Sequence, residues 1–199
     1  SVLPSGVSHA VTSIVQTLAG KHEWRSVTAM AVKGVSDKGT RQAMDELFDQ
    51  TRAILGFKEV ETVEFEKQIA FNSFHIDEIG SSKAALRESM RMITGNSKLN
   101  VHVDSLWGSF FVGVIGTIWL ESTENIELDS IESLFSATSG FQILESKTAV
   151  LDVVGSDEIQ IQVVTEQPNP ANFLTLRFSM DNLRRGSASS LVSLFKQVW

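Results

Sequence analysis

The stretch WRSVTAMAV, residues 24–32, decides the fold class. Apolar positions alternate with polar ones along it and β-branched residues are frequent, a period of two that is typical of a β-strand. The segments on either side, residues 7–18 and 40–55, instead place apolar side chains at every third or fourth position, which is the period of an amphipathic helix. A strand between two such helices predicts a sheet that is covered by helices.

The same two periods predict further strands and helices along the chain. Strands are expected at residues 99–106, 110–121, 141–144, 159–164 and 173–180, and helices at 81–93, 126–135 and 182–198. The acidic segment 57–74 fits neither period and is interpreted as irregular or edge structure. Few of the strands are joined through βαβ units, so we expect an α+β fold: a mixed, mostly antiparallel sheet of about six strands with helices on one face.

Neither an internal repeat nor a Pro- or Ser-rich linker divides the chain, so we predict a single domain over residues 1–199. Helices on one face leave the other face of the sheet to be covered. A second copy of the chain would cover an apolar face there, which predicts a twofold homodimer. We also expect the first and last helices to pack on each other.

Charge and hydropathy exclude several classes of partner. The net charge is −7 and the 17 Lys and Arg residues are scattered, so we expect no nucleic-acid partner. The longest apolar run, residues 110–120, is shorter than the roughly 20 residues that a membrane-spanning helix needs, so no membrane partner is expected. Residues 1–6 lack the pattern of a signal peptide, which favours a cytoplasmic location.

Motifs for cofactors are missing from the sequence. Gly34 and Gly39 have the spacing of a phosphate-binding loop but lack the Lys-Ser/Thr pair that completes it, and no Gly-x-Gly-x-x-Gly follows a predicted strand. The four histidines lie far apart and the chain has no cysteine, so we expect neither a metal nor another cofactor.

Two charged pairs are candidates for binding a small anion. Glu88 and Arg91 lie three residues apart on a predicted helix, where a surface ion pair is the simpler interpretation. Arg184 and Arg185 follow a cap candidate, Asp181, in the first turn of the last predicted helix. Cations there oppose the helix dipole, which favours an anionic partner.

Several segments together resemble the aspartate-semialdehyde dehydrogenase family, in particular its C-terminal catalytic and dimerisation domain. The resemblance covers nearly the whole chain and is most specific at DNLRRGSA, residues 181–188, where the family typically has DNLRKGAA. The other matching segments are the helix after residues 4–6, then residues 27–32, 69–72, 88–93 and 108–121. The resemblance implies a homodimer, an oxidoreductase family of amino-acid biosynthesis, and an NADP-binding domain that would precede Ser1.

The resemblance also implies where the family's functional residues fall. The nucleophilic cysteine falls on Gly6, the acyl-orienting glutamine on Met30, and the substrate-binding arginine and the general-base histidine on Trp107 and Val114. A Glu-x-x-Lys pair that helps to bind substrate and phosphate is partly kept as Glu88 and Arg91. Thioester chemistry needs a thiol and the chain has none, so no catalytic residue is expected.

Three functions remain open from the sequence. The first, which we favour, is a non-catalytic dimerisation or scaffolding domain, a pseudoenzyme. The second is a small anionic-ligand-binding protein that uses Glu88, Arg91, Arg184 and Arg185. The third is a fragment of an NADP-dependent semialdehyde dehydrogenase whose cofactor domain lies on a missing N-terminal segment.

Overall fold

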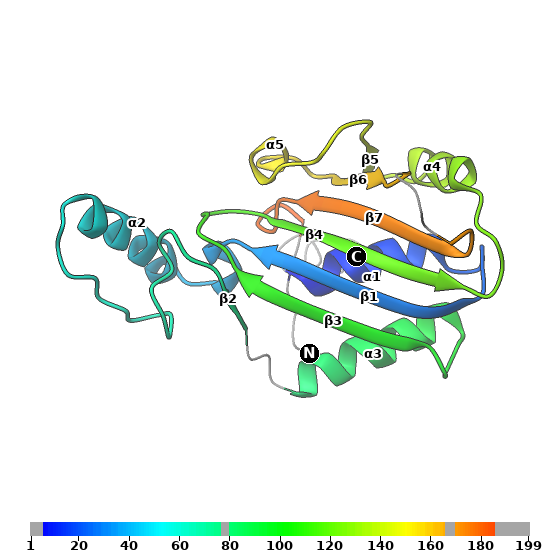
Figure 1. Cartoon of the computed structure of the whole chain (residues 1–199), viewed down its shortest axis with the longest axis horizontal. Helices are drawn as coiled ribbons and strands as arrows, with labels where there is room; N and C mark the ends of the chain where they lie inside the picture. The colour runs from blue at the N-terminus through cyan, green and yellow to red at the C-terminus, as the bar shows by residue number, and fades with distance from the viewer. Residues whose placement is uncertain (1–5, 77–79, 166–169, 186–199) are drawn as a thin grey trace, which may run out of the picture.

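The computed structural model describes residues 6–76, 80–165 and 170–185, and a seven-stranded sheet organises this part of the chain (Figure 1). The strand order is β2-β3-β1-β4-β7-β6-β5. The pairs β1–β3 and β5–β6 are parallel and the other four pairs are antiparallel, which confirms the predicted mixed, mostly antiparallel sheet. The bounds are β1 Trp24–Lys33, β2 Phe74–His75, β3 Asn100–Trp107, β4 Val114–Ser122, β5 Phe141–Ile143, β6 Ile159–Val163 and β7 Phe173–Met180.

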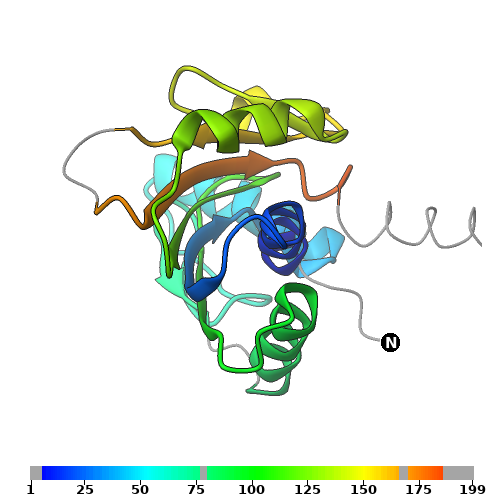
Figure 2. The ribbon, with the colours of Figure 1, turned by 90° about the vertical axis from the view of Figure 1, so that its right-hand side faces the viewer.

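Helices cover one face of this sheet, as the sequence predicts. Figure 2 shows α1 and α3 side by side to the right of the central strands, while α4 packs beside β5 and β6 at one edge. Helix α2 projects past the strand ends in Figure 1. The bounds are α1 Gly6–Leu18, the 3-10 helix η1 Val35–Lys38, α2 Arg41–Leu55, α3 Gly80–Thr94, α4 Leu128–Ala137 and α5 Val150–Val153. Within the described ranges, each helix is too short or too polar to cross a membrane.

Several boundaries differ from the sequence prediction for local reasons. The strand expected from residue 110 begins only at Val114, because Gly113 has a φ of 109° that interrupts extended backbone. Helix α2 begins after Thr40, whose hydroxyl caps the helix by accepting the N–H of Ala43 at 3.2 Å. The last predicted helix lies outside the described residues from residue 186 on, and so does its expected contact with α1.

The main core lies between the sheet and the helices on its covered face. Strand β1 contributes alternate residues, Val27, Ala29 and Ala31, and their neighbours on β4 include Ile118 and Leu120. The stripe of α1 that the sequence predicts packs onto them; it consists of Val7, Val11, Ile14, Val15 and Leu18, all at most 2% exposed. This burial of apolar surface supplies most of the fold's stabilisation.

We call the opposite face of the sheet the open face. It is formed by the strand residues that alternate with those pointing to the covered face. Residues paired directly across antiparallel strands point to the same side of the sheet. Met30 therefore shares this face with Thr117, and Val32 shares it with Ile115. Its half-buried apolar side chains are Met30, Val32, Leu106, Ile115 and Trp119, and polar groups follow on β7 and β6. Of the helices that the structure describes, none covers β1, β3 and β4 on this side (Figure 2).

Candidate functional site

The N-terminus of α1 receives a carboxylate from a distant part of the chain. The N–H of Gly6, the first residue of α1, donates to Oδ1 of Asp37 at 3.0 Å. Asp37 lies 31 positions later, in η1. The first N–H groups of a helix have no partner within it, and the helix dipole favours an anion at this end. Asp37 therefore satisfies both the hydrogen bond and the dipole.

A buried lysine balances this carboxylate. Nζ of Lys33 lies 3.0 Å from Oδ2 of Asp37, and the two side chains are 7% and 6% exposed. The ammonium group also lies 4.6 Å from the ring centroid of Trp107, a cation-π contact. Two charges this deeply buried are tolerated only because each compensates the other and both have further polar or aromatic contacts.

The space around Gly6 is closed. A Cβ atom at this position would lie 2.8 Å from Oδ1 of Asp37, 3.0 Å from Cγ2 of Val114 and 3.1 Å from Cβ of Asn182. Asn182 is itself held in place, because its Oδ1 accepts the N–H of Gly113 at 2.7 Å and the hydroxyl of Ser36 at 3.1 Å. A larger side chain at position 6 would have to displace these groups.

Three of the four positions that the family resemblance assigns to catalysis meet here. Gly6 lies against Val114, and the Trp107 ring contacts the ammonium group of Lys33, which is paired with Asp37. Met30, the fourth, lies in the middle of β1 on the open face. The cluster thus contains a buried ion pair, an indole and an aliphatic side chain. We call it the α1 cap cluster: Gly6, Lys33, Asp37, Trp107, Val114 and Asn182.

The four residues predicted to bind an anion are not brought together. Nε of Arg91 donates to the carbonyl of Leu99 at 3.2 Å, next to Asn100, which pairs with Ser26 on β1. Arg184 follows β7, whose last residue pairs with Val114 and so lies beside the Lys33 end of β1. These two ends are about 23 Å apart at ~3.3 Å per residue. Glu88 is exposed on α3.

The Asp181 turn has the predicted cap, and both arginines after it have partners within the chain. Oδ1 of Asp181 accepts the N–H groups of Leu183 at 2.8 Å and Arg184 at 3.1 Å. The Arg184 guanidinium lies 3.7 Å from Asp157, and that of Arg185 donates to the carbonyl of Gly140. The Arg184 side chain is nevertheless 55% exposed, so its role in binding an anion stays a prediction.

His9 on α1 is perturbed by its surroundings. Its Nε2 atom is buried and has no hydrogen-bond partner. Burial, and secondly the positive charge of Arg185, lower the pKa of His9 below its usual value of 6.5. The imidazole therefore stays neutral at pH 7, and burial beside a cation makes it a poor proton acceptor.

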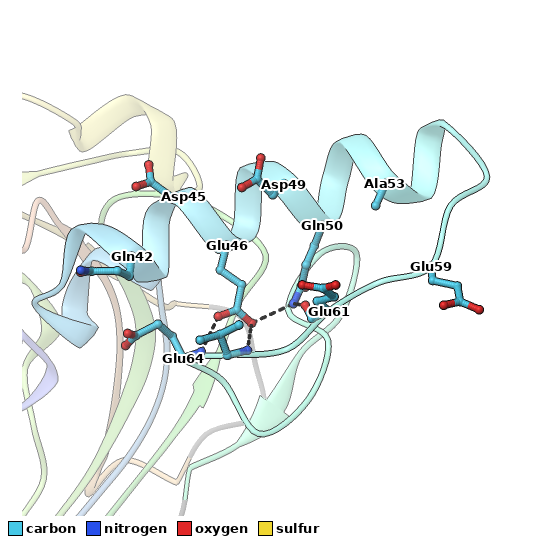
Figure 3. A pocket seen from close by; sticks show the side chains of 10 residues that line it. Gln42, Asp45, Glu46, Asp49, Gln50, Ala53, Glu59, Glu61 and Glu64 are labelled. Atoms are coloured by element: carbon cyan, nitrogen blue, oxygen red, sulfur yellow. Dashed lines mark hydrogen bonds between the residues drawn. The ribbon is translucent and has the colours of Figure 1, made fainter.

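An acidic groove lies between α2 and residues 59–64 (Figure 3). Its most buried carboxylate, Glu46, accepts the N–H groups of Val63 and Glu64, and Gln50 accepts those of Ile69 and Ala70. These side chains fix the irregular segment against α2. In the part of the chain that the structure describes, no group of three or more His, Asp or Glu side chains could hold a metal ion.

The sequence analysis did not identify Lys33 or Asp37 as members of this cluster. A signal for Lys33 was present, because it continues the series Val27, Ala29 and Ala31 on the covered face of β1. A lysine at such a position needs a buried anion. No local pattern could show that the anion would also contact Gly6, 31 residues away.

Comparison with known proteins gives a consistent result. The family model "Semialdehyde dehydrogenase, dimerisation domain" matches residues 15–185. An aspartate-semialdehyde dehydrogenase of Rickettsia bellii is 27% identical over an alignment 207 residues long, and the alignment covers 98% of this chain and 60% of that protein. A USG-1 protein homolog of Pseudomonas aeruginosa is 26% identical and covers 96% of this chain and 59% of that protein.

Solved structures show the same fold. Aspartate semialdehyde dehydrogenase II of Vibrio cholerae superposes with a TM-score of 0.86 at 20% identity, over 97% of this chain and 60% of that one. A probable aspartate-semialdehyde dehydrogenase of Pseudomonas aeruginosa gives 0.83 at 22% identity, over 98% and 61%. The chain therefore spans about 60% of the length of these relatives.

Proposed function

Because this chain belongs to the semialdehyde dehydrogenase dimerisation-domain family, we propose that it is a non-catalytic domain that pairs two copies through the open face. The observation that carries the proposal is the composition of that face. Met30, Val32 and Ile115 lie next to one another across β1 and β4, and Trp119 lies two same-face positions beyond Ile115 on β4, after Thr117. Large apolar side chains on a sheet face that no helix covers within the described part of the chain are typical of an association surface.

A twofold axis suits this surface. In an isologous dimer, each apolar residue near the axis faces the same surface on the second copy. The polar groups on the β6–β7 side, including the Arg177–Gln162 hydrogen bond of 3.2 Å, would then form the rim. An apolar centre with a polar rim is the usual anatomy of a stable protein interface, which buries about 800 Å² of each partner.

The chemistry of the α1 cap cluster supports the absence of catalysis. A thioester mechanism needs a thiol at the helix N-terminus and a proton acceptor near it. Position 6 is glycine, position 114 is valine, and the full chain has no cysteine. Asp37 already occupies the helix N-terminus through its contact with Gly6.

The test is sedimentation of the purified chain with one open-face substitution. We expect the wild type to sediment as a dimer at micromolar concentration and Trp119→Lys as a folded monomer. The interface would otherwise have to bury two ammonium groups, one from each copy, without a counter-charge. The matched control is Leu151→Lys on α5, where the side chain is 83% exposed.

The control should remain dimeric with an unchanged circular dichroism spectrum. A wild type that is only monomeric would contradict the proposal, and so would a Trp119→Lys variant that stays dimeric. Turnover of an aspartate-semialdehyde substrate by the purified chain with NADP would contradict the non-catalytic assignment.

A further inference from the structure

The Asp37 carboxylate lies where an external anion would bind. Two features of different kinds contact it: the first N–H group of helix α1, Gly6–Leu18, and the buried ammonium group of Lys33. A helix N-terminus with a nearby cation is a general binding site for small carboxylates and phosphates. In this chain both features contact the same carboxylate, one through Oδ1 at 3.0 Å and the other through Oδ2 at 3.0 Å.

We propose that Asp37 is an internal ligand, which occupies a carboxylate-binding site formed by α1 and Lys33 and closes that site to external anions. The side chain is buried, and Gly6 leaves no spare volume beside it. The site is therefore built for a carboxylate but is filled by the chain itself. This inference does not depend on dimerisation.

The size of the site determines which ligand replaces the side chain. Asp37→Ala removes one carboxylate group and keeps Cβ, so the vacated space matches formate. The Gly6 N–H and the Lys33 ammonium group are left facing this space, and each loses a partner. Leaving a buried charge without its partner is strongly destabilising, so a bound formate should restore much of the lost stability.

The experiment measures thermal unfolding of the full chain in sodium formate. We expect Asp37→Ala to melt below the wild type, and formate to raise its Tm by about 3 °C or more at a concentration ten times its dissociation constant. Formate should leave the wild type unchanged. It should also leave Asp37→Asn unchanged, because the amide fills the same space.

Two controls separate binding from general salt effects. Sodium pivalate carries the same charge but is too large for the vacated space, so it should not stabilise Asp37→Ala. The double variant Lys33→Met/Asp37→Ala lacks the cation and should not respond to formate. A Tm rise in formate no larger than in pivalate, or one equal to that of the wild type, would overturn the proposal.

If Asp37→Ala does not fold alone, refolding becomes the measurement. Recovery of the native circular dichroism spectrum in formate, but not in pivalate, supports the internal ligand. Failure to recover in either salt contradicts it.

Discussion

The two faces of strand β4 differ although they belong to the same backbone. Ile118 and Ile115 are three residues apart, yet Ile118 is fully buried under the helices while Ile115 is half-buried on the open face. The covered face is uniformly apolar around Ile118, with Ala29 and Leu176 opposite it. Ile115 has Val32 on one side and Ser179 on the other. The covered face is therefore buried by helices of the same chain, whereas the open face is apolar only over its central strands.

The largest expected effect compares these two isoleucines. Ile118→Ala should lower the free energy of unfolding by about 3 kcal/mol, because it leaves a cavity in a closed core. Ile115→Ala should lower that of the monomer by about 1 kcal/mol, since part of the side chain is already in contact with solvent. Urea unfolding at a concentration where the chain is monomeric measures both. Equal losses would show that the two faces are buried alike.

A pH effect of intermediate size is expected from His9 on the covered side. Its pKa is lower in the folded chain than in the unfolded chain, so the unfolded chain takes up more protons as the pH falls through 6.5. The stability is therefore fully present above that value and is lost below it. His9→Gln should lose less stability between about pH 7.5 and about pH 5.5, on either side of the usual histidine pKa. Parallel urea titrations of the two proteins measure the difference. Identical slopes would contradict a buried neutral histidine.

The smallest effect is expected on the polar part of the open face. Arg177 donates to Oε1 of Gln162 at 3.2 Å, and its side chain is partly exposed. Arg177→Ala should lower the free energy of unfolding by about 0.5 kcal/mol, because exposed polar contacts contribute little. Its effect on sedimentation should be smaller than that of Trp119→Lys. A monomeric Arg177→Ala variant would move the centre of the interface from β1 and β4 to β7.

The sequence was sufficient for most elements because their periodicity is local. The alternation of Val27, Ala29 and Ala31 identified β1, and the stripe of α1 identified its buried face. The two-residue strand β2 was missed, since Phe74 and His75 are too few to show a period. The short helix α5 was missed for the same reason.

The candidate site was less accessible to sequence reasoning, because its contacts join distant segments. Gly6 and Val114 could be placed by resemblance, but Asp37 and Lys33 have no matching role in the residues that the resemblance assigns. Charge alone suggested that Glu88 and Arg91 could bind an anion together with Arg184 and Arg185. Only the strand register shows that Arg91 and Arg184 lie next to segments at opposite ends of β1.

Both edges of the sheet are very short, with two residues in β2 and three in β5. An edge strand exposes unpaired N–H and C=O groups that can template the addition of another strand. The edge at β5 offers little backbone for such growth. At the other edge β2 pairs only with Leu106 and Trp107, so among the described residues Asn100–Asp104 of β3 have no strand partner on that side. The proposed twofold contact through the open face, by contrast, would use the available surface after one partner has been added.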